Sequence, residues 1–193
     1  MERESLKQFI RNVIPVSMPV LEKIVSTFND TTIDKGDFFL KAGRPSDHYL
    51  FLETGFLRAY TFDHSGDEVT TGFYGSNSVV FEVYSFFNRT ISKENIQALS
   101  DSTGYTLSYD QLNDLFHTVP EFRDFGRAML VKGFVALKQR MLSLINETAE
   151  QRYSYLIHSN PTVFQNAPLK DIASFLGITD TSLSRIRKNF VQK

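Results

Sequence analysis

The chain has 193 residues, of which 41% are hydrophobic and 13% aromatic, and its formal net charge is −1. This length allows one large or two small domains, and the absence of cysteine excludes disulfides, thiolate iron–sulfur clusters, cysteine nucleophiles and cysteine zinc sites. The charged N-terminus lacks a signal-peptide apolar run, and no stretch approaches the ~18 apolar residues of a membrane span, so we expect a cytoplasmic protein.

Two short amphipathic helices are expected at the start of the chain. The first covers residues 3–13, and the second follows Pro15, with Ser17 as its N-cap and Pro19 in its first turn. Their apolar stripes are Leu6, Phe9, Ile10 and Val13 in the first helix, and Leu21, Ile24, Val25 and Phe28 in the second.

From Thr31 onward, short runs rich in aromatic residues, leucine and threonine are separated by glycines. The sequence His64-Ser65-Gly66-Asp67 is typical of a hairpin turn. The expected strands are 38–41, 49–53, 56–62, 69–74, 95–99 and 104–108. Many short strands at regular spacing predict a small barrel or jelly roll.

The sequence then predicts a short helix over 110–116 and a long one over 121–146. The long helix carries two apolar stripes: one is Phe122, Phe125, Met129, Gly133 and Ala136, and the other is Leu130, Phe134, Leu137, Met141, Leu144 and Ile145. A helix that is apolar on two sides needs two partners. We expect the barrel to cover one stripe and a second copy of the chain to cover the other, as in a coiled coil. The alternative is a helix buried within a single domain.

After a helix over 149–159 and a loop over 162–167, residues 169–190 have the pattern of two helices around a tight turn. Gly177 should end the first helix, and Thr179 should cap the second. Ala173 is small where the two helices must cross closely. This pattern is typical of a helix-turn-helix, whose second helix enters the DNA major groove. The alternative is a helical hairpin that packs on its own domain.

The second of these helices has two chemically different faces. Leu183, Ile186 and Phe190 share one face, and the DNA-contact candidates on and beside the other are Thr179, Asp180, Thr181, Ser182, Ser184, Arg185, Arg187 and Lys188. From Leu169 onward the cations are Lys170, Arg185, Arg187, Lys188 and Lys193, against the acids Asp171 and Asp180. This local excess of positive charge favours contact with phosphates.

The order of these parts resembles the cyclic-AMP receptor and fumarate–nitrate regulator (CRP/FNR) family of dimeric bacterial transcription factors. The motifs that carry the resemblance are Lys35-Gly36-Asp37 with Gly43 and Gly55, the segment 149–153, and Ile172-Ala173 and 176–179 with 182–186 in the last module. The resemblance implies an α+β fold: a sensor β-roll over 1–118, a dimerisation helix over 119–146 and a helix-turn-helix domain over 147–193. It also implies a homodimer on palindromic double-stranded DNA, with RNA polymerase as a further partner.

The cyclic-nucleotide pocket of this family carries over poorly. That pocket uses a glycine–glutamate pair and, about one strand later, an arginine–serine pair. Here Phe81 precedes Glu82, and Ser92-Lys93 occupy the place of the second pair. A buried phosphate needs a charged donor, and we interpret Lys93 and Arg89 as solvated loop cations, so we expect no binding of cyclic AMP. For another small-molecule effector the candidate residues are Phe73, Tyr74, Phe81, Glu82, Ser92 and Lys93, unless these rings simply fill the barrel.

The sequence bears on three function classes. An enzyme is not expected, because the sequence has no phosphate-binding glycine loop, no His-Glu-x-x-His motif and no serine elbow. The scattered histidines favour neither haem nor metal. A small-molecule sensor or interaction module without DNA binding is the alternative to a transcription regulator. Members of the family often add a β-hairpin wing, whereas this sequence ends three residues after Phe190, so DNA contact is expected to depend on the recognition helix and its flanks.

Overall fold

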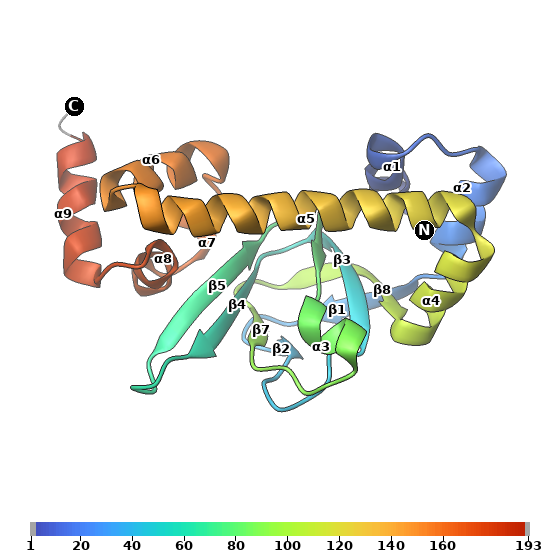
Figure 1. Ribbon diagram of the computed structural model, residues 1–193, viewed down its shortest axis with the longest axis horizontal. Helices are drawn as coiled ribbons and strands as arrows, with labels where there is room; N and C mark the ends of the chain where they lie inside the picture. The colour runs from blue at the N-terminus through green and yellow to red at the C-terminus, as the bar shows by residue number, and fades with distance from the viewer. Residues whose placement is uncertain (1–2, 192–193) are drawn as a thin grey trace.

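The computed structural model describes residues 3–191. Figure 1 shows a roll of two β-sheets beneath one long helix, α5, with α1 and α2 at one end of that helix and α6 to α9 at the other. The helices are α1 (Glu4–Val13), α2 (Met18–Ser26), α3 (Val83–Asn88), α4 (Tyr109–Thr118), α5 (Pro120–Asn146), α6 (Ala149–Ser159), α7 (Val163–Asn166), α8 (Leu169–Leu176) and α9 (Asp180–Val191). The predicted helix, β-roll, long helix and helix-turn-helix order is confirmed.

The β-roll consists of two four-stranded antiparallel sheets. Their strands are β1 (Asn29–Ile33), β2 (Phe38–Leu40), β3 (His48–Thr54), β4 (Leu57–Phe62), β5 (Glu68–Tyr74), β6 (Ser78–Val80), β7 (Asn95–Ala98) and β8 (Ser102–Ser108). One sheet has the order β1-β8-β3-β6, and the other has the order β2-β7-β4-β5. The last strand of the second sheet, β5, is therefore an edge strand.

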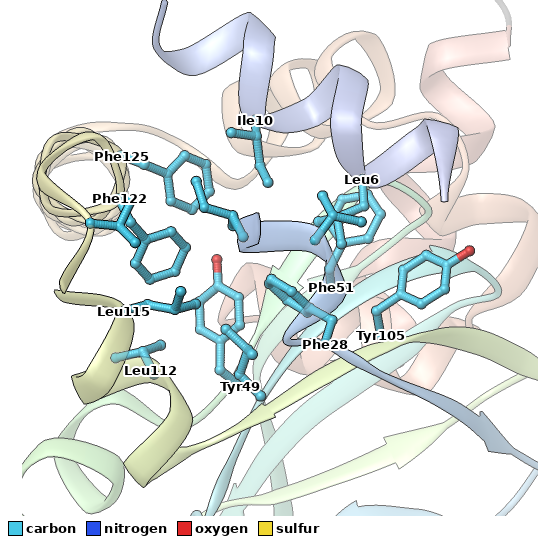
Figure 2. Packing of buried hydrophobic residues seen from close by; sticks show 14 of the residues in the cluster. Leu6, Ile10, Phe28, Tyr49, Phe51, Tyr105, Leu112, Leu115, Phe122 and Phe125 are labelled. Atoms are coloured by element: carbon cyan, nitrogen blue, oxygen red, sulfur yellow. The ribbon is translucent and has the colours of Figure 1, made fainter. Parts of the chain in front are cut away.

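Strand β3, in the middle of the first sheet, is apolar on both faces. Side chains alternate along β3, so that Leu50 and Leu52 point into the roll while Tyr49 and Phe51 point to its outer face. Figure 2 shows these outer rings packed against side chains of α1, α4 and α5, with Leu6 and Ile10 above them and Leu115 and Phe122 beside them. The nearly continuous apolar run of β3 is thus explained by burial on two sides.

Four short elements were missed by the sequence analysis. β1 has a mostly polar sequence, and of its residues only Ile33 is buried. β6 has only three residues, and α7 lies where a loop was expected. The six-residue α3 begins because the Glu82 carboxylate accepts hydrogen bonds from the backbone N–H groups of Tyr84 and Ser85. Ser17 does stand at the N-cap position of α2, but its hydroxyl makes no capping hydrogen bond.

The two stripes of α5 differ in how they are covered. Phe122 and Phe125 are buried in a cluster with residues of α1 and α4, whereas Gly133 and Ala136 are exposed. Helices α1 and α4 lie at the N-terminal end of α5 (Figure 1). The prediction that the barrel covers this whole stripe is therefore wrong beyond Met129, because the covering helices lie at one end only. Within residues 3–191, no helix is long and apolar enough to span a bilayer.

Candidate nucleic-acid interface and sensor site

The C-terminal module is built from α6, α7, α8 and α9 around its own apolar core. Helix α6 begins with a capping box in which the Thr148 hydroxyl accepts from the Gln151 backbone N–H and the Gln151 side chain accepts from the Thr148 N–H. The core consists of Tyr153, Leu156, Val163, Ile172, Ala173, Leu176, Leu183 and Ile186, joined by Phe56 of the β-roll. Ala173 is fully buried, as expected for a close helix crossing.

The turn between α8 and α9 has the geometry that the sequence predicts. Gly177 follows α8 in the left-handed conformation, with φ of 68°, and the Ile178 N–H donates to the Ala173 carbonyl at 3.0 Å. The Thr179 hydroxyl accepts from the Ser182 backbone N–H at 3.3 Å. These local bonds fix the angle at which α9 leaves α8 and so hold the module's exposed helix in place.

Replacing Gly177 with alanine should lower the free energy of unfolding by about 1–2 kcal/mol, because a residue with a Cβ is strained in the left-handed conformation. A Cβ at this position would lie 3.5 Å from Leu144 Cδ2, an ordinary contact, so backbone strain rather than a clash causes the loss. Chemical denaturation measures it. Asparagine tolerates this conformation better, so Gly177→Asn should lose less. Equal losses for the two variants would contradict this explanation.

The polar face of α9 is open to solvent. Thr179, Asp180, Thr181, Ser184, Arg185, Arg187 and Lys188 are exposed, and Ser182 is half-buried. An ion pair of Arg185 with Asp180 or Glu150 would give this arginine a structural role, and within the described chain neither pair is formed. The structure therefore leaves the cations of α9 available to a partner. Lys193, also counted as a cation of this region, lies outside the described residues.

Two arginines from other helices, one of them on α5, cap the C-terminal end of α8. Arg140 of α5 donates to the Phe175 carbonyl at 3.0 Å and stacks 3.7 Å from the centre of its ring. Arg152 of α6 donates to the Leu176 carbonyl, also at 3.0 Å. Burial, and then the charge of Arg152, lowers the pKa of the Arg140 guanidinium. The sequence analysis missed Arg140, since nothing in the sequence distinguishes a capping arginine on α5 from a solvated one.

The proposed sensor residues do not gather in one pocket. Phe73 packs on Phe56 and Phe175 at the interface with α8, whereas its neighbour Tyr74 faces the opposite way, into the β-roll. Phe81 belongs to the helix-covered core on the outer face of the first sheet, beside Tyr49. The three rings therefore belong to separate clusters, because side chains alternate along β5 and the roll separates its two faces.

The polar sensor candidates already have internal partners. Glu82 caps α3, and the Ser92 hydroxyl donates to the Glu94 carbonyl and accepts from the Glu94 N–H, both at 2.9 Å. Lys93 is exposed. Arg89 is exposed, as expected for a loop cation, and it is also paired with Asp47 and stacks on Tyr109.

The interior next to these residues is acidic. Burial raises the pKa of the Glu94 carboxyl, the Thr71 hydroxyl opposes this shift, and the charge of Glu82 adds to it. Burial, followed by the charges of Glu94 and Glu82, raises the pKa of Tyr74 to about 12. A phosphate at this place would meet two carboxylates. Among residues 3–191, no three His, Cys, Asp or Glu side chains are grouped as a metal site.

Comparison with known proteins matches the β-roll to the cyclic nucleotide-binding domain family over residues 31–119. The fumarate and nitrate reduction regulatory protein of Yersinia pestis is 28% identical over 171 residues, covering 82% of this chain and 67% of the relative. The electron transport regulator A of Shewanella oneidensis is 24% identical over 169 residues, with the same coverage. These relatives are regulators rather than enzymes.

Solved structures share the fold over most of its length. CLP of Xanthomonas campestris, a c-di-GMP responsive global regulator, superposes with a TM-score of 0.70 at 15% identity, covering 91% of this chain and 92% of that one. FixK2 of Bradyrhizobium japonicum superposes with a TM-score of 0.71 at 16% identity, covering 86% and 85%.

Proposed function

This chain belongs to the CRP/FNR family of transcription regulators, and from that premise we propose that it acts as a homodimer whose two α9 helices enter the major groove of a palindromic operator. The observation that carries the proposal is the exposed polar face of α9, with three cations free of ion pairs within the described chain: Arg185, Arg187 and Lys188. We assign the sensor, dimerisation and DNA-binding parts to 1–118, 119–146 and 147–193. The ends of α4 and α5 support these limits.

The position of each residue along α9 suggests how it contacts DNA. Asp180, Thr181 and Arg185 lie on the exposed face toward the N-terminal half of the helix, the part that goes deepest into the groove, and we propose them as base readers. The Thr179 hydroxyl lies within hydrogen-bond distance of the Thr181 and Ser182 hydroxyls. We place Thr179, Ser182 and Ser184 near phosphates, together with Arg187 and Lys188.

Asp171, which lowered the net charge counted for this region, is buried against Arg58 of the β-roll. It therefore offsets little of the positive charge that α9 presents to DNA. This supports an interface in which cations contact the phosphate backbone, so that binding to DNA weakens as the salt concentration rises.

The DNA-binding assignment is tested by selecting sequences from a random duplex pool with the wild-type protein. We expect an inverted repeat whose half-sites are separated by about one helical turn, ~34 Å, or a multiple of it. Selection of no sequence at all would favour the alternative, a sensor or interaction module that does not bind DNA. We propose no catalytic role. We propose RNA polymerase as the further partner, because the family implies it, and the cytoplasm as the location where such a regulator would act.

Cyclic AMP should not bind to the β-roll. Glu82 is occupied as the cap of α3, Ser92 is buried in place of a phosphate-binding arginine, and the partly buried Glu94 would repel the phosphate. Isothermal titration calorimetry of the wild-type protein with cyclic AMP should give no binding heat at micromolar concentrations. A micromolar or tighter Kd would contradict the proposal. The effector, if the protein uses one, then has a chemistry other than that of a cyclic nucleotide.

A further inference from the structure

The open edge of the second sheet is closed by the DNA-binding module. β5 is the last strand of that sheet. The outward backbone N–H groups of an edge strand have no neighbouring strand to accept their hydrogen bonds. Here the Thr70 N–H donates to the Ser174 hydroxyl of α8 at 2.9 Å, and that hydroxyl donates to the Thr70 Oγ1, also at 2.9 Å. The β-roll thus holds α8 by hydrogen bonds that join residues 104 positions apart in the sequence.

A buried charge pair lies beside these hydrogen bonds. The Arg58 guanidinium donates to Thr70 Oγ1 at 2.9 Å and to Glu68 at 2.7 Å, and it lies 3.3 Å from the Asp171 carboxylate of α8. The side chains of Arg58 and Asp171 are each only 4% exposed. Burial raises the pKa of the Asp171 carboxyl, and the charge of Arg58 opposes that shift. Removing Arg58 would leave the buried Asp171 carboxylate without its counter-charge, which is costly, whereas removing Asp171 leaves Arg58 paired with Glu68 alone.

This contact, which we call the β5–α8 clasp, consists of Arg58, Glu68, Thr70, Asp171 and Ser174. It does not cover the polar face of α9, because Thr181, Ser184, Arg185 and Lys188 remain exposed while the clasp is closed. The clasp therefore does not block the DNA-contact residues. What it can control is the direction in which α9 points, since only Glu147 and Thr148 connect the end of α5 to α6.

We propose that the β5–α8 clasp fixes the orientation of the DNA-binding module on the β-roll and thereby sets the half-site spacing that the dimer accepts. This inference rests on the proposed function. When one module of a dimer is bound, the second module binds its half-site as an intramolecular step. The effective concentration of that step depends on how well the separation of the two modules matches the separation of the two half-sites. A module held at both the Arg140 contact and the clasp has one orientation. A module released from the clasp can pivot about the short linker and reach half-sites at other separations.

The test compares the wild type with the double variant Asp171→Asn, Ser174→Ala, which removes one charge of the pair and the hydroxyl that binds Thr70. The probe is the inverted repeat selected by the wild type, with two base pairs inserted or deleted between its half-sites. We expect the wild type to bind the native spacing about tenfold or more tightly than the altered ones, and the variant to discriminate by less than about threefold. Ser174→Thr keeps the hydroxyl and should retain the discrimination of the wild type.

Glu22→Gln is the matched control. It breaks the 2.7 Å ion pair of Lys7 with Glu22 between α1 and α2, at the other end of α5 (Figure 1), so it should change stability without changing spacing discrimination. If the double variant does not fold by circular dichroism, Ser174→Ala alone is used, since it leaves the ion pair intact. A folded variant that keeps the wild-type spacing preference overturns the inference only. A wild type that selects no DNA overturns the proposed function and this inference with it.

Discussion

Replacing Arg185 with alanine should weaken operator binding by about 1–3 kcal/mol at each half-site, or roughly 2–6 kcal/mol for a dimer on two half-sites, and should relax preference at one base position. Arg185 is exposed in the first half of α9 and has no ion-pair partner in the described chain. The two parallel N–H groups of a guanidinium match the O6 and N7 acceptors of guanine. Binding measured against a set of single-base operator variants locates the position that loses preference.

Two further substitutions separate base reading from electrostatics. Arg185→Lys keeps the charge but loses the bidentate geometry, so it should relax preference at the same base while retaining most of the salt dependence. Lys188→Ala and Arg187→Ala should weaken binding to all sequences about equally and reduce the salt slope. If Arg185→Ala lowers the melting temperature but leaves operator preference unchanged, Arg185 has a structural role and is not a reading residue.

Charged residues on the uncovered stripe of α5 should convert the dimer into a monomer. Leu137 is 66% exposed in the single chain, and Phe134 and Ile145 are 70% and 69% exposed, which is a large apolar surface for a monomer to leave in water. Leu130, Phe134, Leu137, Met141 and Leu144 recur at the alternating spacing of a coiled-coil seam. A second copy of α5 against this seam would bury the same residues from both chains.

The experiment replaces Leu137 and Met141 with aspartate. Burial of each side chain contributes about 1.5–3 kcal/mol and counts twice in a symmetric dimer, so the pair should remove roughly 6 kcal/mol or more of association free energy. Sedimentation equilibrium should give the mass of a monomer for the double variant. Its affinity for the operator should be lower than that of the wild type. Gln139→Asp is the control, because Gln139 lies on the opposite side of the helix from the seam and its replacement should leave the dimer intact. A monomeric wild type at micromolar concentration would contradict the dimer.

The sequence determined most of what depends on neighbours along the chain. The stop of α8 at Gly177, the cap of α9 at Thr179 and the two faces of α9 follow from local backbone preferences and helical spacing, and the structure confirms them. The hairpin turn at 64–67 and the long α5 follow in the same way. Short elements such as β1 and α3 were missed, because β1 is polar and α3 depends on a single side-chain cap.

Only the tertiary structure decided which distant side chains meet. Phe73 and Tyr74 are adjacent in sequence but serve different cores, since a strand sends neighbours to opposite faces of a sheet. Arg58, Asp171 and Ser174 come together because an edge strand with unpaired N–H groups is covered by a helix that begins about a hundred residues later. No local sequence pattern predicts such a pairing. From the sequence, an arginine on a strand and an aspartate in the first turn of a helix are both expected to be exposed charges, and only the fold buries them against each other.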